Sequence, residues 1–198
     1  MRAHFEILAA LATGTTFVVA NPFLSNKLYF IVPCMLAWLV YLVSRVRRDR
    51  EALREWGLRT DNLRAASRAP LAFTALATLF ITVYRVLAGY RPLPSEALWM
   101  FLLYPLWGLF QQLFVQAMVA GNLLRLGLSR PWVILVAAGL FGAAHLPDAQ
   151  LTLLCLLVGL VWTACFVRIP NLLPLALAHG WLGTLVYYWL LERPPLAP

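Results

Sequence analysis

The chain has 198 residues, of which 62% are hydrophobic and 12% are charged, and its formal net charge is +8. An average soluble domain carries about 25% charged residues, so this chain has too little charge to cover a water-soluble globule. The composition argues against a soluble enzyme, a disordered tail or a disulfide scaffold. It predicts an integral membrane protein, and this length allows about seven spans of about 20 residues each.

Seven apolar helical segments follow one another along the chain, separated by turn signals such as Asn21-Pro22 and Pro170-Asn171. The first resembles a signal peptide, but no cleavage site followed by a polar domain comes after it, so we expect it to be a retained span. The sequence therefore predicts an all-α, polytopic membrane helix bundle that forms a single domain over residues 1–198. The expected helices cover residues 5–19, 28–43, 71–88, 97–124, 132–146, 151–167 and 172–191.

The one long polar segment, residues 45–69, is rich in arginine, and we interpret it as a cytoplasmic, interfacial helix-turn. If it is inside, alternation of the spans places twelve basic residues in inside loops and three in outside loops. The N-terminus is then cytoplasmic and the C-terminus is outside. We expect a multi-pass protein of the bacterial inner (plasma) membrane, whose basic residues contact anionic lipid headgroups and not nucleic acid.

Polar side chains inside membrane spans are the first candidates for function, because they are costly to bury there. The fourth expected helix contains three of them, and Gln112 and Gln116 share one face because they are four residues apart. Histidines lie on small-residue faces of the fifth and seventh helices. We expect these groups to meet in one polar cavity within the membrane. Alternatively, they only hold helices together. The candidate residues are Gln111, Gln112, Gln116, His145 and His179.

The order of these residues resembles that of the CPBP family, the CAAX proteases and bacteriocin-immunity type intramembrane proteins. That family carries Glu-Glu-x-x-x-Arg, then Phe-x-x-x-His, then His-x-x-x-Asn or a variant. The corresponding stretches here are Gln111-Gln112-Leu-Phe-Val-Gln116, Phe141-Gly-Ala-Ala-His145 and His179-Gly-Trp-Leu-Gly183. The segment Glu55-Trp-Gly-Leu-Arg59-Thr-Asp61 is similar to the family's cytoplasmic lead-in, so the family-like core would cover about residues 55–190.

The departures from the family pattern concern its chemistry. The resemblance implies an intramembrane endopeptidase in which two glutamates activate a water molecule, but Gln111 and Gln112 stand at those positions. An amide does not titrate near neutral pH and cannot be a general base. Gln116 stands where the family has arginine. Loss of the acids makes a buried cation costly, so this set of neutral amides is self-consistent and predicts altered or absent glutamate chemistry.

Three functions remain open from the sequence. The first is a CPBP-type intramembrane endopeptidase that acts on a membrane peptide or lipidated substrate, with a histidine as general base and a glutamine as oxyanion donor. The second is a non-proteolytic pseudoenzyme that binds a lipid, an isoprenoid or a partner protein. The third is a purely structural subunit. We expect no cofactor and no metal, because two histidines without a carboxylate or thiolate are an incomplete zinc site.

One geometric difficulty concerns His145 and His179. Because the fifth expected span is short, simple counting places His145 near the outer leaflet and His179 in the inner half of the membrane. The two imidazoles reach one site only if the turn after His145 dips back into the membrane or the helices tilt strongly.

Overall fold

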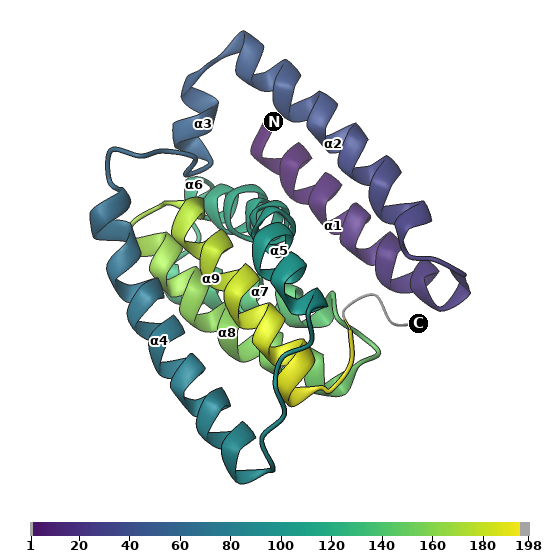
Figure 1. Cartoon of the computed structure of the whole chain (residues 1–198). Helices are drawn as coiled ribbons and strands as arrows, with labels where there is room; N and C mark the ends of the chain where they lie inside the picture. The colour runs from purple at the N-terminus through teal and green to yellow at the C-terminus, as the bar shows by residue number, and fades with distance from the viewer. Residues whose placement is uncertain (1, 195–198) are drawn as a thin grey trace.

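The computed structural model describes residues 2–194, and over these residues every regular element is a helix (Figure 1). The order of the elements confirms the all-helical prediction. The elements are α1 (Arg2–Ala20), η1 (Asn21–Phe23), α2 (Leu28–Arg48), α3 (Glu51–Glu55), α4 (Leu63–Leu87), α5 (Glu96–Gln112), η2 (Leu113–Gly121), α6 (Asn122–Arg125), α7 (Arg130–Ala143), α8 (Ala149–Arg168), α9 (Leu172–Leu185) and η3 (Val186–Leu190).

All seven expected helices are present, although several boundaries differ. The fourth is continuous over residues 96–125 but contains a π-helical stretch, η2. The basic segment is mostly helical, because α2 extends to Arg48, α3 follows, and α4 begins at Leu63 and not at residue 71. Pro70 lies inside α4, where Thr74 Oγ1 donates to its carbonyl oxygen at 2.8 Å.

Within residues 2–194, five segments are long and apolar enough to cross a membrane: Arg2–Phe23, Leu28–Arg48, Leu63–Leu87, Glu96–Arg125 and Ala149–Arg168. A helix rises 1.5 Å per residue, so α7, with 14 residues, is shorter than a hydrocarbon core of about 30 Å. The 14 residues of α9 continue directly into η3, so that helix runs to Leu190. The chain is therefore a polytopic helical bundle in which the short α7 packs among longer helices. The sequence-based expectation of about seven full spans is larger than this number.

The arrangement in space divides the chain into a hairpin and a bundle (Figure 1). Helices α1 and α2 lie beside each other at one side. In the bundle, α9 packs against α5 and α4, and α7 packs against α8. Many large apolar side chains on α2 and α4 are exposed, as lipid-facing helices require. The buried polar residues that were singled out from the sequence lie in the bundle.

Candidate functional site

A chain of side-chain hydrogen bonds joins three of the predicted residues. Gln116 Nε2 donates to Gln112 Oε1 at 3.1 Å, and Gln112 Nε2 lies 3.2 Å from His179 Nδ1. Both glutamines are completely buried, and His179 is 6% exposed. The structure therefore brings together the end of α5, the π-helical segment η2 and the middle of α9, as the sequence predicted for these three residues.

The local backbone explains how the two glutamines reach each other. Gln112 is the last residue of α5, and the π-helical turns of η2 begin at the next residue. A π-helix is a rare local widening of an α-helix and is frequent at functional sites. Gln116 lies within η2, so this widening sets the position of its amide relative to Gln112.

Small residues allow α5 and α9 to approach closely enough for the contact with His179. A Cβ added at Gly180 would lie 2.5 Å from the backbone nitrogen of Pro105, and one at Gly183 would overlap the ring of Tyr104. On the other helix, a Cβ at Gly108 would lie 3.0 Å from His179 Cβ. Small residues commonly permit such close helix packing in membranes. Here glycines on both helices bring the imidazole against α5.

Aromatic rings enclose the imidazole of His179 on several sides. The Trp162 ring stacks on it, with centroids 5.1 Å apart and an angle of 26° between the planes. Tyr104 and Phe141 meet it edge to face, at centroid distances of 5.7 and 5.8 Å. These rings come from α5, α7 and α8, so His179 lies at the point where four helices meet.

His145 lies in the turn after α7 and is connected to the same cluster through Phe141. The phenyl ring of Phe141 is 5.2 Å from the His145 ring and 5.8 Å from the His179 ring, and it meets both edge to face. His145 Nδ1 lies 2.8 Å from the Phe141 carbonyl oxygen. Because a carbonyl can only accept, Nδ1 donates, and Nε2 of the neutral ring keeps its lone pair. The short α7 thus places both imidazoles against one ring, despite the difficulty raised by simple counting.

Gln111 is half-buried and stands apart from the hydrogen-bonded chain. Its Oε1 is buried, and among residues 2–194 it has no donor within hydrogen-bonding distance. In the same part of the protein, Gln116 Oε1 is also buried without a donor. A buried acceptor without a partner costs about 1–3 kcal/mol. The candidate site therefore carries two amide oxygens whose hydrogen-bonding capacity is unused.

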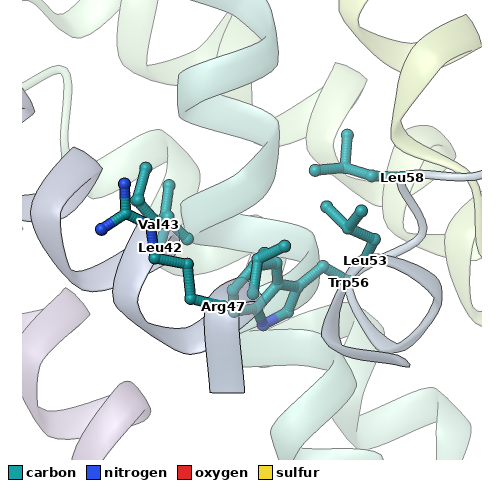
Figure 2. A pocket seen from close by; sticks show the side chains of 7 residues that line it. Leu42, Val43, Arg47, Leu53, Trp56 and Leu58 are labelled. Atoms are coloured by element: carbon teal, nitrogen blue, oxygen red, sulfur yellow. The ribbon is translucent and has the colours of Figure 1, made fainter. Parts of the chain in front are cut away.

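Two features of the described residues bear on ligands. Residues 2–194 contain no group of three or more His, Cys, Asp or Glu that could hold a metal ion. A pocket of about 290 Å³ lies between α2 and α3, away from the glutamine cluster, and Figure 2 shows its wall. It is lined by Leu42, Val43, Val46, Arg47, Leu53, Trp56 and Leu58, and so includes none of the predicted site residues.

The sequence reasoning missed a second buried polar cluster. Glu6, in the first turns of α1, is only 1% exposed. Its carboxylate accepts from Tyr41 Oη at 2.6 Å and from Asn122 Nδ2 at 2.7 Å. A carboxylate inside an apolar segment was the available signal. The aromatic neighbours of His179 were also missed, and helical spacing from Gly159 to Trp162 and Phe166 was the only indication that this face is buried.

The family comparison agrees with the motif resemblance. Residues 93–185 match the family model described as type II CAAX prenyl endopeptidase Rce1-like. All three motif stretches lie inside this range, whereas the lead-in at residues 55–61 lies before it. No significant match to a curated protein or to a solved structure was found. Residues 2–194 contain five segments able to span a membrane, so the chain is an integral membrane protein, and its residues 93–185 are similar to the type II CAAX prenyl endopeptidase Rce1-like family.

Proposed function

We propose that this chain keeps the CPBP scaffold for binding a membrane peptide or a lipidated peptide but no longer carries out glutamate-activated hydrolysis. The observation that carries the proposal is the contact between Gln112 Nε2 and His179 Nδ1. The resemblance implies a glutamate at position 112. The amide that replaces it changes which nitrogen of the neighbouring imidazole carries the proton.

The hydrogen-bond directions support this proposal. The Gln116 amide nitrogen donates to Gln112 Oε1, which leaves the Gln112 amide nitrogen directed at His179. His179 Nδ1 then accepts, so the proton of the neutral ring is on Nε2. A carboxylate at position 112 would instead accept from Nδ1–H and leave Nε2 free as a base. Replacing a carboxylate beside a catalytic histidine by an amide favours the wrong tautomer in the same way in serine proteases.

Burial also supports a role without water activation. Gln112 and Gln116 are fully buried, and Trp162 covers a face of the His179 ring. Hydrolysis requires a water molecule within about 3 Å of a general base. The cluster is better suited to holding helices in a fixed arrangement beside a bound substrate than to delivering water to it.

A specific feature of His145 favours a second candidate, a hydrolase with a rearranged site. His145 is half-buried and its Nδ1 donates to the Phe141 carbonyl, which leaves Nε2 as a free acceptor. That nitrogen has the form a general base needs. The amide of Gln111, on α5, would then be the candidate oxyanion donor.

A cleavage and binding assay separates the two functions. The purified full chain in proteoliposomes is given a farnesylated CAAX-type peptide that carries a photo-crosslinker, and the same peptide without the lipid is the control. The proposal expects crosslinking that depends on the farnesyl group, without cleavage. Cleavage that is lost in His145→Ala would instead establish the rearranged hydrolase. Absence of lipid-dependent crosslinking together with absence of cleavage would contradict both functions.

A second experiment tests the hydrogen-bond directions themselves. Nitrogen-15 chemical shifts of the histidines distinguish the two neutral tautomers, and His145 is an internal control because its Nδ1 donates. We expect a proton on Nε2 of His179 in the natural chain and a proton on Nδ1 in a variant with Gln112→Glu and Gln116→Arg. A proton on Nδ1 of His179 in the natural chain would contradict the proposed reason for lost hydrolysis.

A further inference from the structure

A second pocket, of about 470 Å³, lies where α1 begins and α2 ends. It is lined by Arg2, Phe5, Tyr41, Arg45, Arg48 and Asp49. Arginines outnumber acidic residues three to one in this lining. The pocket contains none of the residues of the candidate site, and it lies before the Rce1-like segment.

The positive charge in this pocket is built into the fold. The side chain of Arg45 is only 8% exposed, and its two terminal nitrogens are held by Asp49 at 2.8 Å and by Glu55 at 3.3 Å. Its Nε is buried and has no acceptor among residues 2–194. A buried donor without a partner is costly, so this arginine retains one unsatisfied N–H group beside the pocket.

The other two arginines are free of the contacts that hold Arg45. Arg2 and Arg48 are exposed. Arg2 is near enough to Asp49 to contribute, after hydrogen bonds from Arg45 and the Glu51 amide, to holding the pKa of Asp49 below its usual range. Asp49 is thus a shared counter-ion, and together with Glu55 it leaves the three guanidinium groups an excess of one positive charge. Guanidinium groups bind phosphate oxygens in a two-pronged geometry that lysine does not match.

The wall of the pocket is apolar as well as basic. The rings of Phe5 and Tyr41 lie 5.9 Å apart, and Phe5 is 57% exposed. The hydroxyl of Tyr41 donates to Glu6, which turns the polar end of this side chain toward a buried carboxylate. An apolar wall below a basic rim suits a ligand that is anionic at one end and hydrocarbon at the other.

The position along the helices places this pocket at the level of lipid headgroups. Both α1 and α2 are long and apolar enough to span a membrane. Arg2 is the first residue of α1, and Arg48 is the last residue of α2. The ends of spanning helices lie at the membrane interface, where basic residues meet the phosphates of anionic lipids.

From this geometry we propose that the pocket between the start of α1 and the end of α2 is a binding site for one anionic phospholipid. The phosphate lies among Arg2, Arg45 and Arg48, and the glycerol backbone and upper acyl chains lie against Phe5 and Tyr41. This site is independent of the proposed function, because it shares no residue with the cluster around His179.

Lipid retention by the purified full chain tests the site. The protein is reconstituted in nanodiscs of phosphatidylglycerol and phosphatidylcholine in equal amounts, and native mass spectrometry counts the lipids that remain bound after release. We expect one phosphatidylglycerol to be retained. The exposed arginines are changed in Arg2→Gln and Arg48→Gln, and retention should fall about fivefold for each arginine removed.

Arg47→Gln is the matched control, because Arg47 is on the same helix, carries the same charge and lines the other pocket (Figure 2). It should leave retention unchanged. An equal loss in Arg47→Gln would show a general charge effect and overturn the site. Equal retention of phosphatidylcholine would also overturn it. If inorganic phosphate displaces the lipid from the natural chain at equal concentration, the site recognises phosphate alone, and a lipid is not its occupant.

Discussion

Polar side chains are buried and uncharged in the cluster around His179, but they are charged and largely exposed in the arginine-rich segment, residues 45–69. In the cluster, Gln112 and Gln116 are buried and uncharged, and they bond to each other and to a ring. In the basic segment, charged pairs such as Arg54 with Asp61 are about half exposed. The two regions differ because a charged side chain loses its hydration when it is buried, which costs much more free energy than burying a hydrogen-bonded amide. Ions remain where water reaches them, and the interior of the Rce1-like segment uses amides and an imidazole.

Three ionisable side chains are nevertheless buried outside the cluster, and each of them has polar partners: Arg45, whose pairs are described above, Arg85 and Glu6. Arg85 is 2% exposed, and its Nη1 donates to Glu192 at 2.5 Å near the end of α4. Glu6 has two hydrogen-bond donors. Arg85 shares the carboxylate of Glu192 with the exposed Arg91, whereas Gln112 and Gln116 form a pair that carries no charge.

The largest effect should come from placing one charge in the neutral cluster. Gln116→Arg alone should lower the free energy of unfolding by about 3–5 kcal/mol, because it leaves a buried cation without a partner. Adding Gln112→Glu should recover part of this loss, since the two charges then pair. A double-mutant cycle on chemical unfolding in detergent measures the coupling, and the exposed substitution Arg64→Gln is the control. Additive losses would contradict pairing within the cluster.

Close packing beside the cluster predicts the next largest effect. Gly180→Ala should cost about 1–3 kcal/mol, because the new Cβ would overlap Pro105 backbone atoms on α5. Gly139→Ala is the control, since a Cβ there meets nothing within 4 Å and alanine favours a helix by up to about 1 kcal/mol. Thermal unfolding of both variants in the same detergent checks the sign. A stable Gly180→Ala protein would show that α5 and α9 are not in close contact.

Loss of the contact between Glu6 and Asn122 should lower the free energy of unfolding by less than the two changes above. Asn122→Leu removes one of the two donors to the Glu6 carboxylate and should cost about 1–2 kcal/mol. Hydrogen exchange should rise in α1 and in α6, because this contact joins them. The Ser67→Ala variant, on α4 and away from this contact, should leave exchange in both helices unchanged. Equal exchange in Asn122→Leu and in the natural chain would contradict the contact.

The smallest effect concerns an exposed pair. Hydrogen bonding to Arg59 lowers the pKa of Asp61 from 3.8 to about 2. A carboxyl whose pKa is lower in the folded state adds stability above pH of about 4, and this contribution disappears as the pH falls through about 2. Carboxyl carbon NMR should report a titration near pH 2 in the natural chain and a higher midpoint in Arg59→Gln, where Arg54 still lies 3.0 Å from the carboxylate. Identical titration midpoints would contradict the pairing.

The helical fold was largely predictable. A long apolar run inside a bilayer must satisfy its own backbone hydrogen bonds and therefore forms a helix, and breakers such as Asn21-Pro22 mark where the helices end. The π-helical stretch was not, since residues 113–121 carry no signal that separates a π-helix from an α-helix. The early start of α4 was missed because residues 45–69 were interpreted as one polar interfacial segment, whereas the helix begins within it at Leu63 and continues through Pro70.

The candidate site was predictable in part. Polar residues in apolar helices identified Gln112, Gln116 and His179, and the structure places them in hydrogen-bonding contact. It could not be predicted that Trp162 stacks on the imidazole or that Phe141 contacts two histidines, because helix rotation and depth decide such contacts. The role of these residues in a reaction stays a prediction.

The hydrogen bond between Glu6 and Asn122 has a consequence for biosynthesis. The two residues are 116 positions apart, so α1 leaves the ribosome long before Asn122 is translated. Until then, the first helix must hold its carboxylate where water can donate hydrogen bonds to it, at the lipid–water boundary. The hairpin α1–α2 can therefore take up its final place only after the first part of the Rce1-like segment has entered the bilayer.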